Sequence, residues 1–515
     1  MVLFSLKTLL GVLLLLHLPI TMAQQVSVSG GRVSGLAMPD GSTIFYGIPY
    51  AAAPSGQLRW KPPAPRAPWA GVRDAGKQAP ACVQADAGWN AALIKDASED
   101  CLTVAIHTPT LDRQARLPVL VYIHGGSNAA GAAGSLEQDA LHREGIVLVK
   151  MQYRLGAFGF LGLEALRKED PHQSSANYGL LDQIAALKWV QTNIAAFGGD
   201  PARVTISGSS AGATDALFLT YSPLAKGLFQ RAIIQSAAPG APRTAAHSDA
   251  MGNELLARLK LPAGTAGLAA LRKLPADKIN AAALNLPVSP GVDPSFTWEQ
   301  LNLDGYVLPH SYAAAHANGA GRDIAIIIGS NTQELGGDRK QDAGAAMVQA
   351  AFGAKAAAAL PLYGYRDGKA PDADPLLGNV PTQVMTDMWF RCPARWLAHR
   401  MRDAGTRVWR YEFGFGAPGS GKPPEHTTEM DYVYHARPSA TPPGDWPPVQ
   451  RYWANFIRNG DPNGDGLPVW PMVAQRDSSI SIAPHGIAAK VNARAELCDL
   501  LFRGVDYPPS AVVPN

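Results

Sequence analysis

The sequence predicts an α/β fold in which a large, mostly parallel, twisted sheet carries helices on both faces. Short runs rich in Val, Ile and Leu, such as residues 118–123, 204–206 and 324–328, alternate with segments that can form helices. Such apolar runs are typical of parallel strands buried on both faces. The chain has 515 residues, 47% of them hydrophobic, with 51 glycines and 42 prolines. We therefore expect one large domain over residues 24–515, with long loop and helix insertions over its functional site.

Residues 1–23 have the pattern of a signal peptide rather than of a folded element. Lys7 precedes the apolar run 9–16, and Thr21 and Ala23 supply small side chains near the expected cleavage position. The run is shorter than the ~20 apolar residues that a membrane-spanning helix needs. We therefore expect an exported protein, periplasmic or secreted, that does not insert stably into a membrane.

A glycine-rich turn follows the first of these apolar runs. Residues 124–127 read His-Gly-Gly-Ser and come directly after the predicted strand 118–123. A turn of this kind can present backbone N–H groups to a carbonyl oxygen. Because ordinary tight turns have a similar composition, this motif indicates a site only in combination with others.

The most informative motif is Gly-Ser-Ser-Ala-Gly at residues 208–212. It lies between the apolar residues 204–206 and a potential helix over residues 213–219. A serine in this setting, here Ser210, is typical of a nucleophile held on a sharp turn, and the glycines suit positions that have no room for a Cβ atom. A serine hydroxyl alone is a weak nucleophile, so the chemistry also needs a histidine base, an orienting carboxylate and N–H donors for the oxyanion.

Several further motifs resemble those of the type-B carboxylesterases and lipases, a family that also contains the cholinesterases. The resemblance covers nearly the whole chain after residue 23 and implies the α/β-hydrolase fold. The similar segments are residues 45–51 (FYGIPYA), 98–102 (SEDCL), 153–161 (YRLGAFGFL), 177–194 (from NYGLLDQ to NI) and 197–201 (FGGDP).

This resemblance implies a catalytic triad and an oxyanion hole. Glu334 ends the turn of residues 329–334 (GSNTQE) after the predicted strand 324–328, and His426 begins the segment of residues 426–433 (HTTEMDYV). Ser210, Glu334 and His426 then follow the α/β-hydrolase order of nucleophile, acid and base. The implied oxyanion donors are the N–H groups of three residues, Gly126, Ser127 and Ala211.

The four cysteines are expected to pair, because disulfides form in the compartments to which exported proteins go. Four cysteines allow three connectivities. The resemblance favours Cys82 with Cys101, beside the mouth of the site, and Cys392 with Cys498, near the end of the chain.

Three residues are candidates for the substrate pocket. Ser209 stands where many relatives have a glutamate before the nucleophile. Arg243 stands, in a gap-free comparison, where relatives such as the cholinesterases place an acyl-pocket tryptophan; its partner would be a protein carboxylate or a carboxylate of the substrate. Trp89 resembles the choline-binding tryptophan of cholinesterases, but its spacing to Cys101 is longer, which favours an ordinary loop tryptophan. Gly337 and Asp338 replace aromatic residues of the cholinesterases.

We interpret the chain as a serine hydrolase of carboxylic esters, with a small-molecule ester and water as its substrates. A non-catalytic adhesion protein on the same fold, like the neuroligins, is the alternative from another class, but those relatives typically lose the triad that this chain keeps. A lipase, or a hydrolase of a specialised toxin or xenobiotic ester, also remains open.

Other function classes find little support. Cysteine and histidine do not fall at metal-ligand spacing and no phosphate or dinucleotide loop occurs, so we expect neither a metal nor another cofactor. A net charge of +3 gives no reason to expect nucleic-acid binding. We expect a monomer or a homodimer. The absence of any Asn-x-Ser/Thr acceptor favours a bacterial source.

Overall fold

The structure is a computed structural model that describes residues 24–134, 136–286, 297–335, 339–474, 477–503 and 505. Within these residues thirteen strands form a single sheet. The predicted signal peptide, residues 1–23, lies outside the described residues. The strands are β1 (Gln24–Val28), β2 (Gly31–Ala37), β3 (Thr43–Pro49), β4 (Val72–Asp74), β5 (Thr103–Thr108), β6 (Leu117–Ile123), β7 (Val147–Met151), β8 (Gly199–Ser209), β9 (Arg231–Gln235), β10 (Ala325–Asn331), β11 (Val408–Phe413), β12 (Ser478–Ala483) and β13 (Gly486–Val491).

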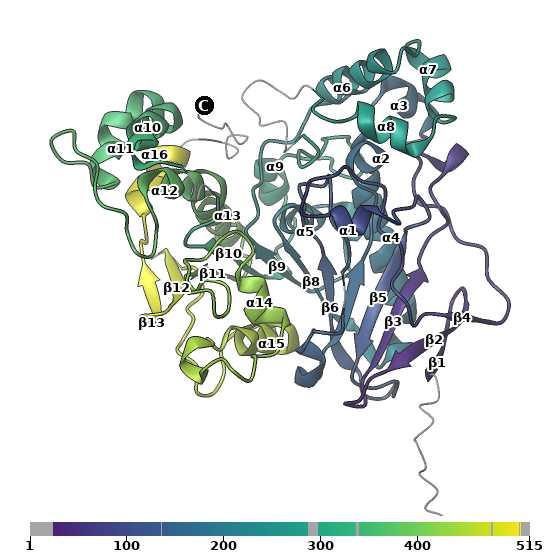
Figure 1. Cartoon of the computed structure of the whole chain (residues 1–515), viewed down its shortest axis with the longest axis horizontal. Helices are drawn as coiled ribbons and strands as arrows, with labels where there is room; N and C mark the ends of the chain where they lie inside the picture. Colours follow the sequence, from purple (N-terminus) through teal and green to yellow (C-terminus); the bar gives the residue numbers. More distant parts are fainter. Residues whose placement is uncertain are drawn as a thin grey trace, which may run out of the picture.

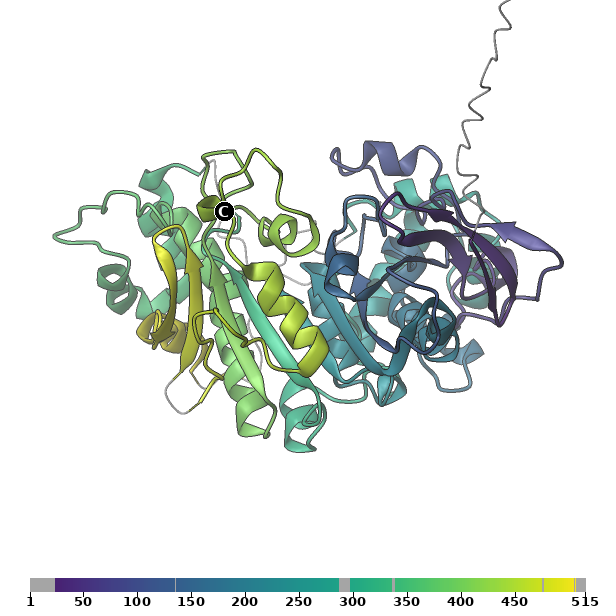
Figure 2. The same cartoon turned by 90° about the horizontal axis from the view of Figure 1, so that it is seen from below.

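The sheet is parallel in its centre and antiparallel at its edges. Its order is β1-β2-β3-β5-β7-β6-β8-β9-β10-β11-β12-β13, with β4 paired to β2. Every neighbouring pair from β7 to β12 is parallel, whereas β1–β2–β3–β5–β7 and β12–β13 are antiparallel. Figure 2 shows the yellow strands β12 and β13 and the purple strands β1–β3 toward opposite sides of the molecule, as the two ends of the sheet. The predicted large, mostly parallel sheet is confirmed, and the structure adds antiparallel strands at both of its edges.

Sixteen α-helices of the described residues surround this sheet (Figure 1). They are α1 (Ala91–Ile94), α2 (Gly156–Phe160), α3 (Glu164–Glu169), α4 (Tyr178–Asn193), α5 (Ala211–Leu219), α6 (Ala245–Arg258), α7 (Gly264–Leu271), α8 (Ala276–Ala282), α9 (Tyr312–Ala317), α10 (Gly344–Phe352), α11 (Ala356–Leu362), α12 (Val380–Thr386), α13 (Cys392–Asp403), α14 (Glu429–Tyr434), α15 (Val449–Asn459) and α16 (Ala495–Phe502).

Both faces of the central strands are buried, which explains their uninterrupted apolar sequences. On β6, Val119 and Val121 belong to one hydrophobic core, and Leu120 between them belongs to another on the opposite face. The first core includes side chains of α4 and α5, and the second includes side chains of α15. Because successive side chains of a strand point to opposite faces, a strand between two cores must be apolar throughout.

Two groups of helices form insertions beyond the sheet. Figure 1 shows α6, α7 and α8 beside α3 on one side, and α10, α11 and α12 beside α16 on the other. By length and composition alone, Gln341–Leu362 is the one helical stretch of the described residues apolar enough to cross a membrane. This stretch is divided into η6 (Gln341–Ala343), α10, η7 (Gly353–Lys355) and α11.

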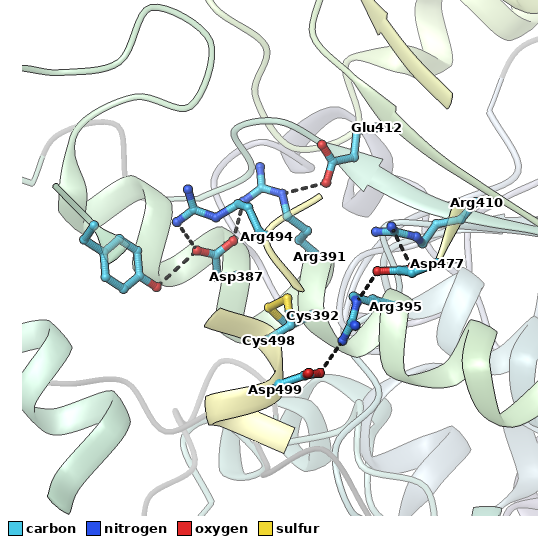
Figure 3. Close-up of a disulfide and its surroundings, with 11 residues drawn as sticks. Asp387, Arg391, Cys392, Arg395, Arg410, Glu412, Asp477, Arg494, Cys498 and Asp499 are labelled. Atoms are coloured by element: carbon cyan, nitrogen blue, oxygen red, sulfur yellow. Dashed lines mark hydrogen bonds and ion pairs between the residues drawn. A yellow bond between two sulfur atoms is a disulfide. The ribbon is translucent and has the colours of Figure 1, made fainter. Parts of the chain in front are cut away.

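The structure contains the disulfides that the resemblance implies, Cys82–Cys101 and Cys392–Cys498. The second disulfide joins α13 to α16 and lies within a group of ion pairs (Figure 3). In this group, Asp387 binds Arg391 and Arg494, and Arg391 also binds Glu412 of β11 at 2.9 Å. Arg395 binds Asp477 and Asp499, and Arg410 of β11 also binds Asp477.

Replacing Asp387 by Asn is expected to destabilise the fold strongly. Asp387 is fully buried, and the change removes the carboxylate that Arg391 and Arg494 share, leaving Glu412 as the one counter-charge that the described residues provide for Arg391. Breaking a buried ion pair in this way costs about 3–5 kcal/mol. The loss should appear as a lower midpoint of urea unfolding at neutral pH.

Asp499→Asn provides a matched control for this prediction. Asp499 pairs with Arg395 and Arg503, but its side chain is 37% exposed, so its loss should cost no more than about 1 kcal/mol. Equal shifts of the two midpoints would show that burial is not the source of the network's stabilising effect.

Candidate active site

Ser210 lies on a strained turn between β8 and α5. Its backbone has φ +58° and ψ −129°, a conformation that L-residues rarely adopt. A Cβ atom on Gly208 would lie 2.1 Å from the carbonyl oxygen of Gly212, and one on Gly212 would lie 2.2 Å from that of Ile123. Both glycines of the motif are therefore required for close backbone packing, as the sequence predicts.

Glu334 and His426 form a close hydrogen-bonded pair. Glu334 follows β10 by three residues, and its Oε2 lies 2.6 Å from Nδ1 of His426. Its Oε1 accepts hydrogen bonds from the Ser236 hydroxyl (2.6 Å) and from the Asn331 N–H (2.7 Å). The backbone N–H of His426 also donates to the backbone carbonyl oxygen of Glu334 at 3.0 Å. These contacts orient the imidazole and leave its Nε2 available.

Ser210 and His426 line the same cavity, which has a volume of about 560 Å³. Its wall comes from the segment around α1, from the end of β6 and the turn after it, from the turn after β8, and from later segments of the chain. The lining residues are Trp89, Leu93, Tyr122, His124, Gly125, Gly126, Ser127, Gly131, Ala132, Ser209, Ser210, Ala238, Glu299, Leu335, Phe390, His426, Thr427 and Met430.

Two of the three predicted oxyanion donors line this cavity, and the third follows Ser210 directly. Gly126 and Ser127 line it, and Ala211 is the first residue of α5, so its N–H has no acceptor within the helix. The Tyr153 hydroxyl supports the turn after β6 by donating to the His124 carbonyl oxygen at 2.7 Å. The turn can therefore present N–H groups at the nucleophile without losing its shape.

The environment of His426 favours its protonated form. Burial lowers the pKa of the imidazole, but the negative charge and hydrogen bond of Glu334 raise it, as does the charge of Glu429, and the net shift is above its ordinary value of 6.5. The side chain remains 21% exposed. An imidazole that gains a proton readily, beside a serine, is suited to general-base chemistry.

Glu429 forms a second buried carboxyl behind the pair. It accepts hydrogen bonds from the amides of Asn331 (2.7 Å) and Gln235 (3.3 Å) and from the Tyr411 hydroxyl (3.2 Å). Burial, together with the charge of Glu334, raises the pKa of Glu429 to about 7. It links β9, β10, β11 and α14 beneath the acid and base.

The three predicted pocket residues fall in different places. Ser209 and Trp89 line the cavity, Trp89 being 64% exposed. Arg243 does not belong to the cavity wall. Its Nε donates to the Gln300 carbonyl oxygen at 2.8 Å, and its guanidinium lies 6.0 Å from the ring of Trp298.

Arg243 is therefore satisfied inside the protein rather than at the predicted acyl pocket. Burial lowers its pKa to about 10, and no carboxylate of the described residues forms an ion pair with it. The backbone of Arg243 pairs with Asn302 in a short parallel bridge, and the side chain is held by the segment of residues 298–300 rather than facing the cavity. Gly337 and Asp338, the other predicted pocket substitutions, lie outside the described residues.

Sequence analysis missed several residues of the cavity wall, and two of them lie where they can affect the chemistry. Phe390 lies in the π-helix η8 (Asp387–Arg391), and its ring centroid is 5.0 Å from that of His426. A π-helix of one turn frequently marks a functional site, but no residue pattern revealed this one. Glu299 lies in a segment that carried no recognised motif.

Comparisons with known proteins agree with this geometry. The chain matches the carboxylesterase family over residues 22–501. It is 34% identical to the liver carboxylesterase of Sus scrofa, over 92% of this chain and 90% of that protein. It is 38% identical to the fumonisin B1 esterase of Sphingopyxis macrogoltabida, over 76% of this chain and 71% of that protein.

Two solved structures are also similar. PNB esterase has a TM-score of 0.78 and 30% sequence identity, covering 93% of this chain and all (100%) of its own. The Geobacillus stearothermophilus carboxylesterase EST55 has a TM-score of 0.77 and 30% identity, covering 93% of this chain and 99% of its own. The chain belongs to the carboxylesterase family and is a carboxylic ester hydrolase with the α/β-hydrolase fold.

Proposed function

We propose that this hydrolase works through an acyl-enzyme on Ser210, with His426 as base and acid and Glu334 as the group that orients it. One observation supports this assignment above the others. The serine on the strained turn shares a cavity with a histidine whose Nδ1 is bound by a buried carboxyl. A non-catalytic adhesion protein on the same fold does not need a catalytic triad, whereas this chain keeps Ser210, Glu334 and His426.

The steps follow from these positions. His426 Nε2 takes the proton of the Ser210 hydroxyl while Oγ attacks the ester carbonyl carbon. The N–H groups of Gly126, Ser127 and Ala211 stabilise the resulting oxyanion. His426 then gives the proton to the leaving alcohol, and a water molecule, activated in the same way, releases the acid and restores the serine.

The cavity favours a small-molecule ester over a lipid aggregate. A volume of about 560 Å³ falls within the ~300–1,000 Å³ typical of sites for drug-sized ligands. Polar groups such as Glu299 and Ser209 stand among apolar ones in its wall. We therefore propose a carboxylesterase acting on compact esters rather than a lipase.

The two disulfides indicate an oxidising compartment. We propose that the protein is exported to the periplasm or the medium and that residues 1–23 are removed as its leader.

Ser210→Ala is expected to abolish ester hydrolysis, with a loss of about 10⁶-fold in kcat. An organophosphate should modify wild-type protein at Ser210, and mass spectrometry of the peptides locates the adduct. The neighbouring Ser209→Ala variant is the control, because its peptide should still carry the adduct at Ser210. Full turnover by Ser210→Ala, or an adduct on another serine, would contradict the proposal.

The activity is also expected to fall in acid. The imidazole must be neutral to accept the serine proton, so kcat/KM should decrease as the pH falls through the pKa of His426, which lies above 6.5. Glu334→Gln removes the charge that raises this pKa, so its weaker residual activity should persist to lower pH. The pH dependence of kcat/KM tests both statements. An acid limb that does not move in Glu334→Gln would exclude the proposed pairing.

A further inference from the structure

Glu299 is a carboxyl in the wall of the catalytic cavity for which the proposed mechanism has no role. It lines the cavity together with Ser127, Ser210 and His426, yet it is only 6% exposed. The Thr214 hydroxyl, on α5, donates to its Oε1 at 3.5 Å, and the Ser127 hydroxyl also hydrogen bonds to this carboxyl. Glu299 therefore lies where the oxyanion turn meets the start of α5.

A negative charge on Glu299 has little to stabilise it. In the described part of the chain no lysine or arginine forms an ion pair with it, and its Oε2 receives no hydrogen bond. The titratable groups that act on it are His426, in the same cavity, and Asp215, on α5. Asp215 is itself buried and is bound only by neutral amides, those of Asn128 at 3.0 Å and Gln183 at 2.5 Å.

These surroundings favour the neutral form of the carboxyl. Burial is the largest effect and raises the pKa of Glu299 to about 8; Asp215 raises it further, while His426 and the two hydroxyls oppose the shift. Below that pH the group is a carboxylic acid, which has an O–H to donate. Above it the group is an anion, which can only accept hydrogen bonds.

We propose that Glu299 is a specificity-determining residue that, as a neutral carboxylic acid, donates a hydrogen bond to an oxygen acceptor on the acyl chain of the ester. The favoured substrates are esters whose acyl part carries an ether or carbonyl oxygen close to the scissile bond. This inference rests on the proposed function, because the acyl chain reaches Glu299 only if Ser210 is the residue that is acylated.

Ionisation of Glu299 reverses this effect. The anion no longer donates to the acyl chain, and its charge lies beside Ser127, whose N–H is a proposed oxyanion donor. A negative charge next to a developing oxyanion raises the barrier. Hydrolysis should therefore weaken as the pH rises through about 8.

The test compares p-nitrophenyl methoxyacetate with p-nitrophenyl butyrate, whose acyl chains have equal length and differ by an ether oxygen in place of a methylene. The measured quantity is the ratio of the two kcat/KM values at pH 7, in wild type, Glu299→Gln and Glu299→Met. Gln keeps a donor but cannot ionise, whereas Met keeps the volume without a donor. The ratio should stay within about twofold of wild type in Gln and fall about tenfold in Met. Equal ratios in all three would overturn the proposal.

The pH dependence of this ratio in the wild-type protein provides a test that does not depend on whether a variant folds, and Glu299→Gln serves as its control. In wild type the ratio should fall as the pH rises through about 8, and in Glu299→Gln it should remain constant. A wild-type ratio that stays constant or rises with pH would show that the anion binds the acyl chain as well as the acid does, which overturns the proposal.

Two controls separate this inference from the proposed function. Glu254→Gln removes a partly exposed carboxylate of α6 and should match wild type in both measurements. Organophosphate labelling of Ser210 in each variant reports whether the nucleophile is intact. Labelled Ser210 with an unchanged ratio refutes the role of Glu299 alone, whereas unlabelled Ser210 in wild type refutes the proposed mechanism.

Discussion

The catalytic geometry depends on the strained backbone of Ser210. A residue held at positive φ costs about 1–3 kcal/mol and persists only where its surroundings permit no other conformation. Here the Ser210 N–H donates to the Gln235 carbonyl oxygen on β9 at 2.9 Å, and its own carbonyl accepts from Ala213 and Thr214 of α5. The serine is thus held by the neighbouring strand β9 on one side and by its own helix α5 on the other, so the geometry of the turn depends on the pairing of β8 with β9.

The acid and the base are held from the other half of the sheet. Arg391 donates to the Thr332 carbonyl oxygen at 2.7 Å, two residues before Glu334, and Phe390 beside it contacts the His426 ring. The ion pairs around Asp387 and the second disulfide therefore do more than join α13 to α16 (Figure 3). They fix the segments that carry Glu334 and contact His426, so the proposed acid and base keep their positions relative to Ser210.

The sequence carries the parts of the site that local geometry dictates. The turn around Ser210 needs two glycines, and the oxyanion turn needs a short glycine-rich segment, so both leave a pattern in consecutive residues. The family resemblance, which rests on further motifs, likewise predicted Glu334 and His426. It also predicted the pairing of Cys82 with Cys101 and of Cys392 with Cys498.

What could not be predicted depends on contacts between distant segments. Glu299 enters the cavity from a segment without a motif. Its pKa is raised by burial and by the nearby charge of Asp215, and neither its burial nor its proximity to Asp215 can be seen in the sequence. Arg243 shows the opposite error: a position inferred by counting along the chain lies outside the pocket, because its contacts are with Gln300 and Trp298, which are distant in the sequence. The π-helix that brings Phe390 to His426 has no residue signature either.

The division of the site between the two halves of the chain has a consequence for how activity is interpreted. The serine and its oxyanion donors precede residue 213, whereas the acid and base follow residue 333. The two halves meet where β9 pairs with β10 in the middle of the sheet. On the proposed mechanism, a chain that ends before His426 lacks the base that Ser210 requires and does not hydrolyse esters. Hydrolysis would then require both halves of the chain, so a truncated product would be scored as inactive however well its first half folds.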